Sequence, residues 1–325
     1  MNQPILSVDR LSKTFVVRRT IFGRPTAVVK AVDTVTFDLF PGETLGLVGE
    51  TGCGKSTLAR TLAGLYQPTT GTAHFKGQDL HAAYNKHDSM RLKRQIQMIF
   101  QDPYASLNPR MTINNILEEP LDIHRLASGS EKAARIASLL QQVGLTPEQG
   151  SRFPHECSGG QRQRVGIARA LAVNPELIIC DEPISALDVS IQAQIINLLE
   201  QLQADLGLTY LFIAHDLSMV RHISTRVAVM YLGSLVELAP TEELYSHPLH
   251  PYTQALLSAI PIPDPTLESQ RKRILLTGDI PSPLDPPTGC KFHNRCRYAL
   301  EICKKNSPDL TATAPDHYTA CHLVK

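Results

Sequence analysis

The stretch from Gly49 to Ser56 reads GETGCGKS, which places two glycines, a lysine and a serine in the pattern G-x-x-x-x-G-K-[ST]. In this pattern glycines let backbone N–H groups wrap the phosphates of a nucleotide, Lys55 reaches the β- and γ-phosphates, and the Ser56 hydroxyl is a ligand of Mg²⁺. An apolar stretch precedes it and a helical pattern follows, as the motif requires. A glycine-rich turn is the alternative. The predicted nucleotide-binding residues here are Gly49, Glu50, Thr51, Gly52, Cys53, Gly54, Lys55, Ser56 and Thr57.

An acidic pair follows a second apolar stretch, in LIICDEP at 177–183. Asp181 is placed to hold Mg²⁺ through its water shell, and Glu182 could polarise an attacking water. Gln101 ends the apolar stretch of IFQDP and could touch the metal ion or its water, and His215 ends a later strand, where its ring could reach a γ-phosphate. Acids in a loop, a structural histidine and an unremarkable glutamine are the alternatives. The predicted catalytic residues are Glu182, His215 and Gln101, and the predicted Mg²⁺ ligands are Ser56, Gln101 and Asp181.

A second phosphate-binding pattern lies a hundred residues later, in ECSGGQRQR at 156–164. A Ser-Gly-Gly turn that opens a helix points backbone N–H groups and a positive dipole end outward, which favours phosphate binding. The candidate residues are Ser158, Gly159, Gly160 and Gln161. Because the first motif already supplies a phosphate cradle, this one raises the question of whose phosphate it binds.

The last cysteines of the chain, Cys290, Cys296, Cys303 and Cys321, are separated by five, six and seventeen residues in a Pro-rich region with little apolar periodicity. Such a region suggests that a metal centre organises it in place of a hydrophobic core. Zinc sites usually contain a tight C-x₂₋₄-C pair, whereas looser spacing suits an iron–sulfur cluster. We therefore expect these thiols to hold a cluster, with zinc or free thiols as alternatives.

The composition sets limits on the class of protein. The 325 residues carry a formal net charge of +1, which gives no basic surface for nucleic acid. No signal-peptide pattern and no run of eighteen apolar residues is present, so we expect a cytosolic protein whose cysteines are not paired as disulfides.

The elements that must position these residues alternate between strand and helix. Apolar stretches at 44–49, 176–181, 208–215 and 226–233 predict interior strands of a parallel sheet, and 189–207 predicts an amphipathic crossover helix with Ile191, Ile195, Leu199, Leu202 and Leu206 on its apolar face and Gly207 at its end. Residues 112–143 are helical in pattern but outside any crossover, which predicts a helical insertion. After residue 247 the chain becomes Pro-rich. The predicted class is α/β, with a mostly parallel core sheet, a helical subdomain at about 102–165, a main domain at 1–247 and a small irregular domain at 248–325.

In this order, the motifs resemble those of the ATPase subunits of ABC transporters over nearly the whole chain. The matching residues are the P-loop at 49–56, Gln101, the signature CSGGQ at 157–161, LIICDE at 177–182, SALD at 185–188 and His215. The resemblance implies a P-loop NTPase fold with a β-rich N-terminal part. It also implies that Ser158 and Gly160 bind the nucleotide held by a neighbouring subunit, that Asp188 crosses the same interface, and that Phe15 stacks on adenine. A core role for Phe15 is the alternative, and Cys157 stands where the family has a larger apolar residue, which predicts weaker packing there.

The stretches IQMIFQDPYASLNPRMT and HPLHPYTQALLSAIPIPDP resemble the bacterial oligopeptide and dipeptide importer group, and within it the second ATPase subunit most. That resemblance implies ATP and Mg²⁺ as ligands, a [4Fe–4S] cluster in the C-terminal part, a second, different ATPase subunit, two membrane permeases and an external peptide-binding protein. It implies a peripheral location on the cytoplasmic face of the membrane, with the helical insertion as the docking surface. Import of another solute such as nickel, and a non-transport ATPase, are the alternatives.

Overall fold

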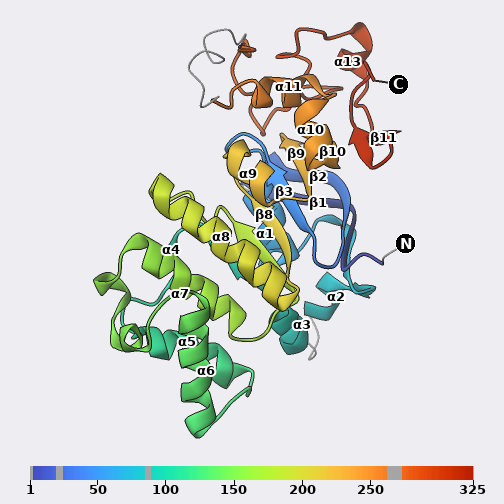
Figure 1. Cartoon of the computed structure of the whole chain (residues 1–325). Coiled ribbons are helices and arrows are strands. Elements are labelled where there is room, and N and C mark those ends of the chain that lie inside the picture. The colour runs from blue at the N-terminus through green and yellow to red at the C-terminus, as the bar shows by residue number, and fades with distance from the viewer. Residues whose placement is uncertain (1–2, 20–24, 85–88, 262–272, 325) are drawn as a thin grey trace. The chain divides into compact units, whose positions relative to one another are not determined.

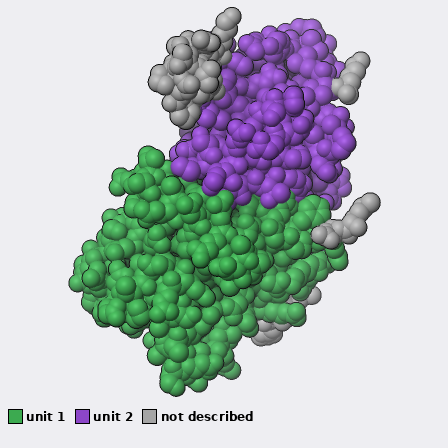
Figure 2. All heavy atoms as spheres, in the orientation of Figure 1, with its two compact units in different colours: residues 1–5, 39–44, 75–214 green, residues 6–38, 45–74, 215–325 purple. Residues whose placement is uncertain are grey.

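The structure, a computed structural model, describes residues 3–19, 25–84, 89–261 and 273–324. The chain divides into two compact units, which Figure 2 shows in different colours. Unit 1 contains residues 1–5, 39–44 and 75–214, and unit 2 contains residues 6–38, 45–74 and 215–325. Each unit therefore combines segments that lie far apart in the sequence.

Unit 1 is built on parallel strands. Strand β6 (Ile96–Ile99) pairs with β7 (Leu177–Asp181), which pairs in parallel with β8 (Thr209–Ile213). Every residue of β7 and β8 is buried, as the uninterrupted apolar stretches predict for interior strands. The parallel pairing brings the carboxyl ends of β6 and β7, after which Gln101 and Glu182 follow, to the same edge.

The helices of unit 1 lie largely between β6 and β7 in the sequence. Helices α4 (Pro103–Ser106), α5 (Ile113–Ile123) and α6 (Gly129–Gln142) pack against α7 (Gly159–Leu171) (Figure 1). The prediction that this helical region belongs to no crossover is wrong, because the region connects β6 and β7, which are parallel neighbours. The sequence prediction does not include β6 as a strand. The other elements of unit 1 are β5 (Gln78–Asp79), α2 (Leu80–Tyr84), α3 (Ser89–Gln95), two 3₁₀ turns (Pro147–Ser151 and Pro154–Glu156) and α8 (Val189–Leu206).

Helix α8 confirms the predicted amphipathic helix. It begins after Asp188 and ends at Gly207, whose φ of 66° is the left-handed conformation that stops a helix. Its buried face includes Ile195, Leu199 and Leu202, but Leu206 is exposed. The apolar spacing therefore continues to Leu206, one turn beyond Leu202, the last buried residue of the helix.

Unit 2 contains the strand that precedes GETGCGKS. Strand β3 (Thr44–Val48) pairs in parallel with β9 (Arg226–Tyr231), and β9 forms a hairpin with β10 (Ser234–Pro240). Strands β2, β1 and β4 are neighbours in a second sheet, which confirms a β-rich N-terminal part. The other elements of unit 2 are β1 (Leu6–Arg19), β2 (Pro25–Leu39), α1 (Lys55–Leu62), β4 (Thr70–Phe75), α9 (Leu217–Ile223), α10 (Thr241–Ser246), α11 (Pro251–Leu257), α13 (Glu301–Lys305), β11 (Thr311–Ala314) and β12 (His317–Thr319).

The C-terminal region adds strands to the same sheet. Strand β12 pairs antiparallel with β10, and β11 pairs with β12. The buried carboxylate of Glu237 accepts a hydrogen bond from His317 Nε2 at 2.7 Å and another from the backbone N–H of His250 at 3.0 Å. The predicted boundary between 247 and 248 stays a prediction, since the compact units divide the chain elsewhere.

Among the described helices, none combines the length and the apolar character that crossing a bilayer demands.

Candidate nucleotide site

The loop between β3 and α1 depends on glycines at two close approaches. A Cβ on Gly49 would lie 2.2 Å from the backbone oxygen of Met230, and one on Gly54 would lie 2.0 Å from that of Ala31. Both glycines also have positive φ values, 152° and 110°, which other residues rarely adopt. Glycine is therefore required at both positions, and the predicted strand, loop and helix order is confirmed.

Lys55 is held inside this loop. Its Nζ donates hydrogen bonds to the backbone oxygens of Gly49 at 2.7 Å and Glu50 at 3.1 Å, and the residue is 4% exposed. Burial raises the pKa of the neighbouring Cys53 thiol, although the Lys55 ammonium opposes the change. Lys55 is therefore the cation aimed into the loop, beside a neutral thiol. This is the arrangement that a phosphate-binding lysine needs.

The acidic pair lies in unit 1, at the end of β7. Asp181 is fully buried, and Glu182 follows with a φ of 49°, an unusual conformation for a non-glycine residue. The backbone N–H of Glu182 donates to Ile213 O at 3.0 Å, and its Oε2 accepts from Gln101 Nε2 at 2.8 Å. The structure therefore brings together two of the three predicted catalytic residues. A strained backbone held in place by its neighbours is characteristic of functional sites.

The Ser-Gly-Gly turn opens a helix, as predicted. Ser158 is the N-cap of α7: its Oγ accepts from Gln161 N at 3.3 Å, and Gln161 Oε1 accepts from Ser158 N at 3.0 Å. Ser158 is exposed, whereas Gly160 lies so near α8 that a Cβ would be 2.6 Å from Ile191 Cγ2. Asp188, the N-cap of α8, is exposed. Ser158 and Asp188 thus both lie at the surface of unit 1.

The third predicted catalytic residue, His215, belongs to unit 2. It is exposed and comes directly before Asp216, whose carboxylate caps α9 by accepting from Ser218 N at 2.8 Å. The cap fixes where the chain turns after His215.

Phe15 lies on β1 and contacts Tyr66 and Lys13. Its ring meets that of Tyr66 edge to face, with centroids 5.4 Å apart. The Nζ of Lys13 lies 5.0 Å from the Phe15 centroid and 5.7 Å from the Tyr66 centroid, and donates to the backbone oxygen of Gln67. Lys13 and Tyr66 were not predicted from the sequence, in which the one signal for them is that Tyr66 closely follows the helix after the P-loop.

Two further residues missed from the sequence contact Glu50 within the P-loop. Arg295 donates to both carboxylate oxygens of Glu50, at 2.9 and 3.1 Å, and the hydroxyl of Tyr252 accepts from the Glu50 backbone N–H at 2.9 Å. These partners are more than two hundred residues from Glu50 in the sequence, so no local pattern could have found them.

The four C-terminal cysteines are close enough to influence one another. Burial and the neighbouring thiols of Cys303, Cys321 and Cys296 raise the pKa of Cys290 to about 11. Burial and nearby cysteines also raise the pKa values of Cys296 and Cys321. Among the described residues, however, no group of three or more His, Cys, Asp or Glu side chains is arranged to hold a metal ion. The structure supports a shared neighbourhood for these thiols but not a formed metal site.

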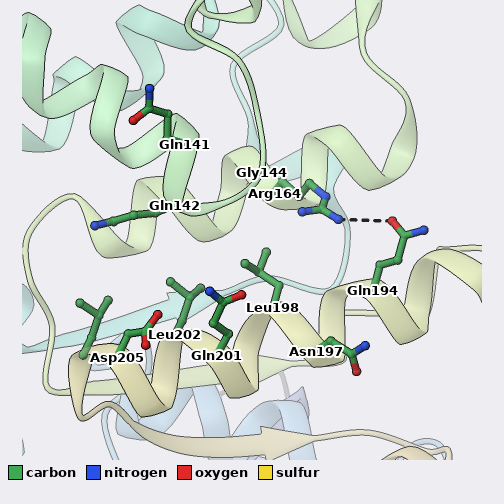
Figure 3. A pocket seen from close by; sticks show the side chains of 11 residues that line it. Gln141, Gln142, Gly144, Arg164, Gln194, Asn197, Leu198, Gln201, Leu202 and Asp205 are labelled. Atoms are coloured by element: carbon green, nitrogen blue, oxygen red, sulfur yellow. Dashed lines mark hydrogen bonds between the residues drawn. The ribbon is translucent and has the colours of Figure 1, made fainter.

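A cavity of about 530 Å³ lies on unit 1 between α6, α7 and α8 (Figure 3). Arg164 Nη2 donates to Gln194 Oε1 at 3.3 Å across its rim, and much of the lining is uncharged amide side chains. None of the predicted site residues lines it. This cavity is therefore distinct from the nucleotide motifs.

Comparison with known proteins adds independent information. Residues 32–185 match the family model described as ABC transporter, and residues 236–303 match the one described as oligopeptide/dipeptide transporter, C-terminal region. The chain is 54% identical to the oligopeptide transport ATP-binding protein AppF of Bacillus subtilis, over 99% of this chain and 98% of that protein. It is 56% identical to the oligopeptide transport ATP-binding protein OppF of Escherichia coli, over 93% of this chain and 90% of that protein.

Solved structures agree on the fold. The chain resembles a chain of the ATP-binding cassette MJ0796, in the dimeric structure of its post-hydrolysis state bound to ADP and Pi, with a TM-score of 0.65 and 27% identity. That match covers 73% of this chain and 98% of the other. CbiO1 from Clostridium perfringens, part of the ABC transporter complex cbiONQ, gives a TM-score of 0.64 at 26% identity, over 76% of this chain and 92% of that chain.

Proposed function

Because the chain belongs to the ABC transporter family of ATP-binding proteins, we propose that it hydrolyses ATP to power peptide import by a membrane transporter. Peptide is favoured as the cargo by the family match at 236–303 and by the relatives named for oligopeptide transport. The observation that carries the ATPase activity is the Glu182 carboxylate, which directly follows buried Asp181 and is held by Gln101 at 2.8 Å.

The chain's own residues divide the work of hydrolysis. The P-loop N–H groups and Lys55 bind the phosphates, while Gln101 orients Glu182 to accept a proton from the attacking water. His215 is proposed to contact the γ-phosphate, and Phe15 to stack on adenine beside Tyr66. The Ser56 hydroxyl, the Asp181 carboxylate and the Gln101 amide are all oxygen donors, the kind of ligand that suits Mg²⁺, and would hold it, Asp181 through the metal's water shell. When bound, Mg²⁺ neutralises charge on the phosphates.

The surface position of the signature turn supports the proposal that it serves a second subunit. Ser158 is exposed at the start of α7. The two capping hydrogen bonds use the N–H groups of Ser158 and Gln161, and the other N–H groups at a helix start need partners from outside the helix, which a phosphate can supply. Ser158, Gly159, Gly160 and Gln161, with Asp188, would then bind the nucleotide held by a different ATPase subunit. Two permeases and a peptide-binding protein would complete the transporter, with this chain on the cytoplasmic face of the membrane.

The decisive experiment is Glu182→Gln in the transporter assembled with its permeases and partner ATPase. Removing a positioned general base should lower ATP hydrolysis and peptide uptake by about a hundredfold or more, because water is no longer activated. Nucleotide binding should persist. The matched control is Asp205→Asn, which neutralises an exposed acid near the end of α8 and should leave both rates unchanged. Near-normal hydrolysis by Glu182→Gln, with the partner's site also disabled, would contradict the role of Glu182.

We propose in addition that Cys290, Cys296, Cys303 and Cys321 hold a [4Fe–4S] cluster, with zinc as the alternative. The support is that neighbouring cysteine thiols contribute to the raised pKa values of Cys290, Cys296 and Cys321, and that the four cysteines lie in a segment poor in regular structure. Protein purified without oxygen should be brown and contain about four iron atoms per chain, and Cys296→Ser with Cys303→Ser should remove them. Colourless protein with stoichiometric zinc would contradict the cluster.

A further inference from the structure

The C-terminal region contacts the P-loop through a largely buried ion pair between Arg295 and Glu50. Arg295 Nη1 lies 2.9 Å from Glu50 Oε2, and Nη2 lies 3.1 Å from Oε1, so the guanidinium binds the carboxylate with both nitrogens. The Arg295 side chain is 7% exposed and that of Glu50 is 22% exposed. Two-point pairing of this kind fixes orientation as well as distance, and shielding from water strengthens it relative to a surface pair.

The same residue of the loop is held at a second point. The Tyr252 hydroxyl accepts a hydrogen bond from the backbone N–H of Glu50, and Tyr252 is fully buried. Its ring packs against those of Tyr231 and Phe292, with centroids 4.7 and 5.4 Å apart. Both the side chain and the backbone of Glu50 are therefore fixed from outside the P-loop.

Glu50 in turn contacts the phosphate-binding lysine. Its backbone oxygen accepts from Lys55 Nζ at 3.1 Å, next to the shorter hydrogen bond from Lys55 to Gly49. The position of the Lys55 ammonium thus depends on the position of Glu50. Arg295, Glu50 and Lys55 form a continuous chain of contacts from the C-terminal region to the group that binds phosphate.

We propose that Arg295 is a positioning residue of the nucleotide site, which fixes Glu50 so that the P-loop and Lys55 stay in the conformation that binds ATP. This inference rests on the proposed function as an ATPase. Arg295 lies within the part of the chain that matches the C-terminal region of oligopeptide/dipeptide transporters, outside the part that matches the ABC transporter model. The C-terminal region then contributes a residue that positions the nucleotide site.

Lys291, in the same segment as Arg295, also makes long-range contacts, and it offers a control that distinguishes positioning of the P-loop from simple attachment of the segment. Lys291 Nζ donates to Asp33 Oδ2 at 2.8 Å, to Leu232 O at 2.8 Å and to Ser234 Oγ at 2.7 Å. These contacts tie the segment to β2 and to the β9–β10 hairpin without touching Glu50. Lys291→Met should therefore loosen the segment while leaving the Arg295–Glu50 pair in place.

The test measures MgATP affinity by calorimetry on the full chain, in a Glu182→Gln background that prevents turnover, together with thermal stability. Arg295→Met should weaken MgATP binding by about tenfold, the typical effect of losing a charge-assisted hydrogen bond. Glu50→Gln should weaken it similarly, and the double variant should be no weaker than the weaker single one, because both remove the same interaction. Arg295→Lys should restore part of the affinity. Lys291→Met and Arg297→Met, the latter at an exposed arginine two residues away, should bind MgATP as the parent does.

The outcomes distinguish the inference from the proposed function. If Arg295→Met binds MgATP as tightly as its parent, Arg295 does not position the P-loop. If Lys291→Met loses as much affinity as Arg295→Met for the same loss of stability, the segment acts only as an anchor and the inference is wrong. If the parent chain itself does not bind MgATP, the proposed function fails and the inference fails with it.

Discussion

The two phosphate-binding motifs of this chain are held in opposite ways. The signature turn is held by its neighbours in sequence, since Ser158 and Gln161 cap the same helix three residues apart. The P-loop is held by distant segments: Gly233 N donates to Cys53 O at 2.8 Å, and Arg295 binds Glu50. A motif held locally forms wherever its helix forms, whereas one held at long range depends on the whole of unit 2.

The long-range support of the P-loop is tested most directly at Gly54. Because a Cβ there would lie 2.0 Å from Ala31 O and φ is +110°, Gly54→Ala should lower the free energy of unfolding by about 3 kcal/mol or more. Gly52→Ala is the matched control, because it has a positive φ of 80° but nothing within 4 Å, and should cost only about 1–2 kcal/mol. Denaturant unfolding measures both. Equal losses would show that backbone conformation alone, and not the distant contact, controls the P-loop.

Acid should destabilise the contacts that hold the P-loop before it affects the capping of α7. Burial lowers the pKa of His250 from 6.5 to about 3, and its Nδ1 accepts from Tyr252 N, so the folded protein holds it neutral. The unfolded chain binds a proton below pH 6.5 and the folded one does not, so stability is present above that pH and falls as the pH drops toward 3. From pH 6 to pH 4 the free energy of unfolding should fall by about 2 kcal/mol.

The measurement is denaturant unfolding across this pH range, with hydrogen exchange at the P-loop and at α7. His250→Asn, which keeps an acceptor for Tyr252 N, should flatten the dependence. His247→Asn, at an exposed histidine three residues earlier, should not. Acid-induced exchange that begins in α7 and reaches the P-loop later would reverse the expected order.

The smallest effects are expected in the signature helix. Gly160→Ala should destabilise the protein by about 1 kcal/mol, because the new Cβ would lie 2.6 Å from Ile191 Cγ2, a side-chain methyl group that can give way more easily than backbone. Gly166→Ala, in the same helix with nothing within 4 Å, should stabilise it by about 0.5–1 kcal/mol. Unfolding curves give both values, and MgATP binding by the P-loop of this chain should stay unchanged. A loss of that binding in Gly160→Ala would show that the two motifs are coupled within one chain.

Much of the fold was predictable because short apolar stretches, turn residues and helix caps can be recognised within a few neighbouring residues. The strands that became β3, β7, β8 and β9 are short apolar stretches with turn residues around them, and α8 has a cap at each end. The predicted strands do not include β6, although its last residues belong to the apolar stretch that ends at Gln101. Without it, the helical region could not be seen as the connection between two parallel neighbours.

The sequence by itself determined the motifs, because the spacing of Gly49, Lys55 and Ser56, or of Ser158 and Gln161, is read within a few residues of chain. Only the tertiary structure decided which side chains hold those motifs in place. Gln101 meets Glu182 across eighty-one residues, and Arg295 meets Glu50 across two hundred and forty-five. Such pairs depend on which strands become neighbours and which loops their ends bring together. For the shielded Arg295, burial also makes a charged partner necessary.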